Sequence, residues 1–316
     1  MLQQGYAFGY LLAVVFARVF VDTTSHGWRP LFWFGACPPV FIILFRLTLP
    51  ETKVYQERQA LRSASKNATA TFVAEGKLAL KRHWMLLIYM VALMSAFNFM
   101  SHGSQDLYPT LLKSNHNFNP DQVTATMVIA KIGALVGGTL IGYYSQMFGR
   151  RLTIMVAAVL GAAVIYPYTM VGDMKVAIVA FIEMFCVQGA WGVIPIHLME
   201  LSPPSYSAFI VGTSYQLGNL VSSAASTIEA SIAEHYPLPP INGKEREDYS
   251  KVMLVLMVFV FSAVILFTFL GPEYRNKKFD VAHDHDIEDA AQVSREDVDR
   301  ILHNEKGAPT ASKSVV

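Results

Sequence analysis

Polar and titratable side chains are concentrated in one short stretch of an otherwise apolar segment, residues 98–110. The stretch contains the following polar residues: Asn98, Ser101, His102, Ser104, Gln105, Asp106 and Thr110. Polar side chains in hydrocarbon are costly, and they usually face a water-filled path or a ligand. The stretch therefore predicts a polar wall inside a membrane.

Four of these polar groups share one side of a helix. At 100° per residue, an arc of about 100° holds all four: Asn98, His102, Gln105 and Asp106. The opposite side carries apolar side chains: Leu93, Met94, Met100 and Leu107. A stripe of this kind indicates a cavity wall, although hydrogen bonds that only join helices use similar residues.

His102 and Asp106 are spaced four residues apart, so their side chains can meet on a helix surface. Histidine titrates near pH 6.5 and aspartate near pH 4, and a neighbouring carboxylate favours the protonated imidazole. A protonated His102 attracts an anion, and the attraction weakens when the proton leaves. We expect the two residues to form a proton-coupling site for an anion.

The segments that must position these residues have the length and composition of membrane helices. Of 316 residues, 53% are hydrophobic and 16% charged, against about 25% charged in soluble proteins. A bilayer core needs about 20 apolar residues per helix. Eight stretches approach that length: 3–20, 30–48, 84–106, 122–145, 152–171, 176–198, 208–230 and 252–271. We expect an all-α integral membrane protein whose polar tail, 272–316, is largely disordered.

Basic residues recur in the segment 49–83, in the turn near residue 150 and after the last span. These segments fall on one side when eight spans alternate, and the positive-inside rule places that side, with both chain ends, in the cytoplasm. The net charge of +1 gives no reason to expect nucleic acid as a partner. The sequence shows no nucleotide-binding motif, nucleophile constellation or metal-ligand spacing, so we expect neither an enzyme nor a cofactor.

A second polar stripe lies in the seventh span, where Gln216, Asn219 and Ser223 share a face. Neutral amides there can hold a carboxylate or hydroxyl without a buried charge, although the neighbouring glycines also suit simple helix packing. Lys131 and Glu183 are further charges within spans. Either residue can pair with another helix or line the transport path.

The turn near residue 150 resembles a known family motif. Gly142-Tyr-Tyr-Ser-Gln146-Met-Phe-Gly149-Arg150-Arg151 is similar to the G-x-x-x-D-x-x-G-R-R loop of the major facilitator superfamily. The resemblance assigns Gly142, Gly149, Arg150 and Arg151 to a gating loop, with Gln146 where the family usually has aspartate. Glu200-Leu201-Ser202-Pro203 resembles the cytoplasmic end of the tenth helix in that superfamily.

The polar stretch matches every fixed position of N-x-x-[ST]-H-x-[ST]-Q-D-x-x-x-T. This is the signature of the fungal Jen-type carboxylate:proton symporters, within the sialate:proton symporter family. The resemblance implies proton symport of short monocarboxylates such as lactate, pyruvate or acetate at the plasma membrane, by alternating access. It assigns substrate contacts to the polar stretch, to Gln216 and Asn219 on the eleventh helix, and to Phe8 on the fifth.

Such symporters have twelve helices in two halves, and the motif order makes this chain an N-terminally truncated one, with helices five to twelve. The expected parts are 1–48 (last two helices of the N-terminal half), 49–83 (cytoplasmic central loop) and 84–271 (six-helix C-terminal half). We expect a partner chain to cover the surface left by the missing helices. Two other functions stay open: a non-transporting sensor or partner fragment, and a sugar or phosphate transporter of the same superfamily.

Overall fold

The computed structural model describes residues 4–21, 26–50, 68–202, 207–241 and 244–272. The expected disordered tail beyond residue 272 and residues 51–67 of the expected central loop lie outside this part of the chain. The elements are α1 (Gln4–Phe16), η1 (Ala17–Val21), α2 (Arg29–Thr48), α4 (Ala68–Gln105), α5 (Tyr108–Ser114), α6 (Pro120–Phe148), α7 (Arg150–Met170), α8 (Val176–Leu201), α9 (Ser207–Ser222), α10 (Ala225–Ala233), β1 (Pro237–Ile241), β2 (Lys244–Glu247) and α11 (Tyr249–Leu270).

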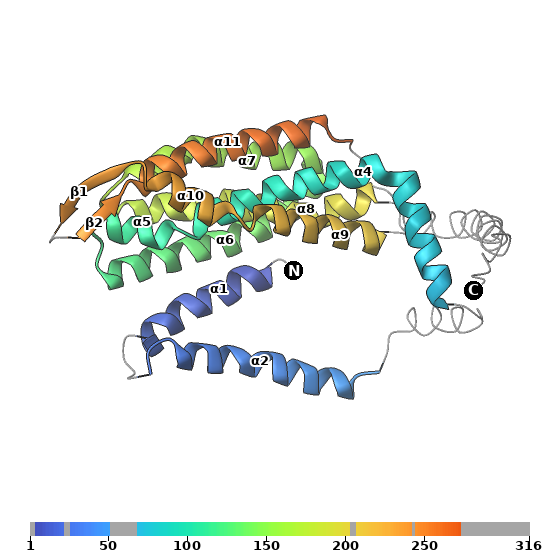
Figure 1. Cartoon of the computed structure of the whole chain (residues 1–316), viewed down its shortest axis with the longest axis horizontal. Coiled ribbons are helices and arrows are strands. Elements are labelled where there is room, and N and C mark those ends of the chain that lie inside the picture. The colour runs from blue at the N-terminus through green and yellow to red at the C-terminus, as the bar shows by residue number, and fades with distance from the viewer. Residues whose placement is uncertain (1–3, 22–25, 51–67, 203–206, 242–243, 273–316) are drawn as a thin grey trace, which may run out of the picture.

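Helices α4 to α11 form one bundle, and α1 and α2 lie to one side of it (Figure 1). α1 packs along α6, whereas α2 contacts η1 and buries none of its residues. Seven segments of the described chain have the length and hydropathy of a membrane span. The fold is therefore all-α and membrane-spanning, as the composition predicts.

The expected span 208–230 is divided into α9 and α10. The division follows two serines whose hydroxyls donate to carbonyls of the preceding turn, Ser222 to Asn219 at 3.2 Å and Ser223 to Leu220 at 2.7 Å. Such bonds compete with the helical ladder and often bend a helix. The amphipathic pattern alone does not reveal this break.

The boundary expected between the central loop and the third span falls at a kink in α4. His83 has non-helical torsions (φ −119°, ψ 23°), and the chain is helical on both sides of it. The span begins there, close to the expected residue 84, but the preceding segment from Ala68 is helix rather than loop. The expected loop before α11 likewise contains the antiparallel pair β1–β2.

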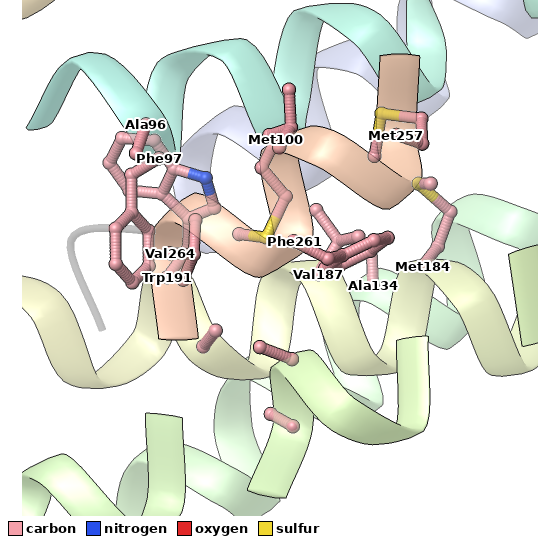
Figure 2. Packing of buried hydrophobic residues seen from close by; sticks show 14 of the residues in the cluster. Ala96, Phe97, Met100, Ala134, Met184, Val187, Trp191, Met257, Phe261 and Val264 are labelled. Atoms are coloured by element: carbon pink, nitrogen blue, oxygen red, sulfur yellow. The ribbon is translucent and has the colours of Figure 1, made fainter. Parts of the chain in front are cut away.

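The apolar core of the bundle lies where α4, α8 and α11 meet (Figure 2). Phe97 of α4 packs edge-on against Trp191 of α8, with ring centroids 5.5 Å apart. Phe261 of α11 and Met100 of α4 are buried in the same cluster. This packing fixes the rotation of α4, and with it the direction in which the polar stretch faces.

Two glycines set the distance between α6 and α8. A Cβ atom placed on Gly133 would clash with the backbone carbonyl oxygen of Phe181. A Cβ atom placed on Gly137 would clash with that of Phe185. Lipid tails are as apolar as the helices, so close van der Waals packing between small residues drives helix association in membranes. The two backbones can touch only because these positions have no side chain.

We expect Gly137→Ala to destabilise the purified chain by about 1–3 kcal/mol, the usual cost of overpacking. Gly212→Ala on α9 is the matched control, because nothing lies within 4 Å of its added Cβ and alanine is the better helix former. Apparent Tm in detergent should fall for the first variant and stay level or rise for the second. Equal Tm values would contradict the close α6–α8 approach.

Candidate functional site

The polar stretch straddles the end of α4. The helix ends at Gln105, and α5 begins at Tyr108 with Pro109 in its first turn, so Thr110 lies on the second helix. Proline suits the start of a helix because it has no N–H to donate. The other polar residues of the stretch lie on α4 or directly at its end.

His102 and Asp106 are joined as expected. His102 Nδ1 lies 2.9 Å from Asp106 Oδ2, and the two side chains are 37% and 35% exposed. A hydrogen-bonded imidazole–carboxylate pair within a membrane span can take up and release a proton. The short contact and the partial exposure of both side chains are what a titratable pair at the surface of the bundle needs.

Three other members of the stretch turn toward the bundle itself. Asn98 Nδ2 donates to the carbonyl of Met94 at 2.9 Å, and Ser104 Oγ donates to that of Met100 at 2.7 Å. Ser101 is also buried. These groups satisfy at least part of their hydrogen-bonding capacity within their own helix, so the stripe is less uniform than its spacing indicates.

Gln105 contacts a different helix. Its Oε1 accepts a hydrogen bond from Nζ of Lys131 on α6, and both residues are 1% exposed. The Lys131 ammonium also lies 3.6 Å from the centroid of the Tyr10 ring on α1. Lys131 thus joins α6 to α4 and to α1, and among the described residues it forms no ion pair with Glu183.

Glu183 and Glu229 are buried carboxyl groups. Within the described residues, neither oxygen of either side chain has a hydrogen-bond partner. Glu229 lies against α4, with Oε1 3.4 Å from the position of a Cβ on Gly103. No role was predicted for Glu229 from the sequence of α10, although a lone acid within an apolar membrane segment usually indicates a functional site.

The register of α9 and α10 along α4 follows from two close approaches. A Cβ on Gly218 would lie 2.8 Å from Met94 Cβ, and Gly103 faces Glu229 further along the same helix. α4 and the α9–α10 segment therefore run in the same direction.

This register separates Asn219 from the His102–Asp106 pair. Asn219 lies beside the middle of α4, about ten residues or roughly 15 Å along the axis from Asp106. Gln216 is exposed, and Phe8 is 53% exposed. Asn219 is half-buried. Within the described residues, the His102–Asp106 pair has no hydrogen bond to Gln216, Asn219 or Phe8.

The predicted gating loop forms a buried ion pair. Gly149 ends α6 with φ +94°, a torsion that favours glycine, and places Arg150 at the start of α7. Arg150 Nη2 lies 3.2 Å from Glu200 Oε1, and its Nη1 donates to Ser145 Oγ at 2.6 Å. Arg151 donates to the Thr268 carbonyl at 3.0 Å, which ties the turn to the end of α11.

The Gly142 position lies within the same end of α6. A Cβ placed there would lie 3.2 Å from the Gly192 carbonyl oxygen of α8. Gly142 therefore supports close packing of the two helices that carry Ser145 and Glu200. The gating-loop residues and their contacts therefore lie together at one end of the bundle.

A second ion pair lies at the opposite end of α6. Arg18 in η1 donates to Asp121 Oδ1 from Nε at 2.9 Å and from Nη2 at 2.7 Å. The pair connects the first spanning segment to the start of α6. Sequence reasoning assigned Arg18 no such contact, because the two residues lie 103 positions apart.

Residues 1–280 match the family described as "Sugar (and other) transporter". The chain belongs to this family. Its fold is that of the major facilitator superfamily, and its curated relatives are transporters rather than enzymes.

Family members differ in what they carry. A carboxylic acid transporter protein homolog of Saccharomyces cerevisiae is 38% identical over 85% of this chain and 46% of its own length. The cis,cis-muconate transport protein of Acinetobacter baylyi is 24% identical over 71% of the chain and 54% of its own length. The chain thus spans about half the length of these relatives. The inward-open structure of the xylose transporter XylE from Escherichia coli aligns with a TM-score of 0.49 and 16% identity, over 71% of this chain and 56% of that one.

We expect Glu200→Gln to destabilise the chain by about 3–5 kcal/mol, since removal of one partner leaves the buried Arg150 charge uncompensated. Asp173→Asn is the matched control: it breaks the exposed pair with Lys175, and exposed pairs contribute about 0–1 kcal/mol. Thermal unfolding in detergent separates the two. A Tm for Glu200→Gln equal to that of Asp173→Asn would contradict a structural role for the buried pair.

Proposed function

We propose that this chain belongs to a proton-coupled symporter of the fungal Jen type that carries short monocarboxylates such as lactate, pyruvate or acetate across the plasma membrane. The observation that carries the proposal is the His102–Asp106 contact of 2.9 Å within a membrane span. The 38% identity to a carboxylic acid transporter homolog supports the substrate class.

The His102–Asp106 pair couples the movement of the proton to that of the anion. Proton uptake at His102 places a positive charge beside the path, which attracts a carboxylate. When the proton leaves, the attraction weakens and the anion is released. Joint movement of proton and anion transfers no net charge, which lowers the electrostatic cost of crossing a medium of low dielectric constant.

Two ion pairs support alternating access, in which each end of the path opens in turn. In the orientation given by the positive-inside rule, both chain ends and the Arg150–Glu200 pair are cytoplasmic. The Arg18–Asp121 pair then lies at the extracellular end, where it joins α1 to α6. The proposal assigns α1 to the N-terminal half and α6 to the C-terminal half, so this contact holds the extracellular end closed.

The family description includes sugars, but the polar stretch favours an anion. A neutral polyol is bound by hydrogen bonds and needs no titratable group. A histidine–aspartate pair is useful where charge is taken up and released. Competition with labelled lactate uptake by acetate and pyruvate, but not by glucose, would support the acid over the sugar.

We expect cells that express the chain to take up labelled lactate faster at pH 5 than at pH 7, since a larger fraction of the His102 imidazole carries a proton at the lower pH. The double variant His102→Ala, Asp106→Asn should reduce this uptake to the background of cells without the chain. Initial rates at both pH values, normalised to surface expression, measure the effect.

His116→Gln is the matched control, because His116 is another half-buried histidine at the end of the bundle. Burial lowers the pKa of His116 from its usual value, and its Nε2 lies 3.1 Å from the Thr169 carbonyl oxygen. This variant should keep the pH response. Uptake that is absent in the unaltered chain, or that persists in the double variant, would overturn the proposed function.

A further inference from the structure

Lys131 is a basic residue inside the bundle that has no carboxylate partner among the described residues. Its side chain is 1% exposed, and the residues described by the structure form no ion pair with it. Burial of an unpaired charge is expensive. A lysine kept at such a position is either compensated by weaker contacts or reserved for an anion that binds there.

The contacts of Lys131 compensate it only in part. The Nζ atom donates to Gln105 Oε1 and lies above the face of Tyr10. An ammonium has three donors, and a ring face attracts a cation without accepting a directed hydrogen bond of full strength. Donor capacity therefore remains at Nζ.

Gln105 has an unused donor beside this cation. Lysine can only donate, so the oxygen of the Gln105 amide must be the atom that faces Nζ. Its Nε2 is buried, and among the described residues it has no hydrogen-bond partner. A buried amide donor without an acceptor is uncommon in proteins. Two adjacent donors, one of them charged, match the two oxygens of a carboxylate.

We propose that Lys131 is the residue that binds the carboxylate of the transported acid, with Gln105 Nε2 as the second donor and Tyr10 as the wall behind the ammonium. This inference rests on the proposed function and names the contact that the function requires. The acid displaces the Gln105 oxygen from Nζ when it binds, so the present contact is the closed form of the site.

The charges near Lys131 explain why one proton accompanies one acid. Asp106 is paired with His102, and it directly follows Gln105, the residue whose amide oxygen accepts from Lys131. With Lys131 protonated and His102 neutral, the lysine and the aspartate balance. With His102 protonated, the cluster carries one net positive charge, which a single carboxylate neutralises.

Other titratable groups lie on neighbouring elements. Tyr6 and Tyr10 belong to α1, Glu183 to α8 and Glu229 to α10. The two glutamates are buried with no hydrogen-bond partner in the described part of the chain, which favours the neutral acid, and the tyrosines are neutral at physiological pH. They leave the balance of the three charged groups unchanged.

The test is equilibrium binding of labelled lactate to the purified full chain at pH 5, with lactamide as the neutral competitor of the same shape. We expect lactate to bind and lactamide not to compete. Lys131→Met should weaken lactate binding by roughly 10- to 100-fold, the loss expected for a charged hydrogen bond. Lys131→Arg should retain more affinity than Lys131→Met, because it keeps the charge.

Lys175→Met is the matched control, since it removes an exposed lysine and should leave binding unchanged. Thermal unfolding separates ligand binding from a structural role. Replacement of a buried cation by an apolar side chain of similar volume is often neutral or stabilising, so the Tm of Lys131→Met should not fall.

Three results would overturn the inference. Lactate affinity in Lys131→Met within twofold of the unaltered chain would exclude Lys131 while leaving the proposed function standing. A lower Tm in Lys131→Met, with no recovery of binding in Lys131→Arg, would assign the lysine a structural role. Absence of lactate binding by the unaltered chain would overturn the proposed function and this inference with it.

Discussion

A polar group inside a bilayer has no water to bind, and the structure depends on how each such group is satisfied. The backbone is satisfied by helix formation. Asn98 and Ser104 donate to carbonyls of their own helix. Close approach of helices through Gly133 and Gly137 then provides the packing that holds the bundle together without a hydrophobic driving force.

The two buried basic residues, Arg150 and Lys131, have different contacts, and these contacts have different consequences. Arg150 meets a carboxylate and a hydroxyl, so its charge is matched in this structure. Lys131 meets an amide oxygen and a ring, and the amide beside it keeps an unused donor. The first arrangement stabilises one conformation. The second leaves capacity for an anion, which is what a transport site needs.

Much of the fold could be predicted from the sequence because it depends on local composition. Seven expected spans appear as helices, and His102 meets Asp106 because four residues make one turn. The division of 208–230 was missed, because two serine hydroxyls bond back to their own helix there. Hydrophobicity does not report such bonds.

The candidate site was harder to predict, because it depends on contacts between helices. Lys131 was recognised as an intramembrane charge, but its partner Gln105 lies 26 residues away on another helix. The rotation of α4 that brings them together is set by packing such as Phe97 against Trp191. Likewise, the register at Gly218 separates Asn219 from Asp106, which no spacing within either helix reveals.

We propose that one proton balances one carboxylate at the cluster of Lys131, Asp106 and His102. This balance is tested most directly by the number of protons taken up when the purified chain binds lactate at pH 7, measured calorimetrically in buffers of different ionisation enthalpy. The account predicts uptake of about one proton per lactate, because binding then stabilises the protonated imidazole. Binding with no proton uptake would contradict it.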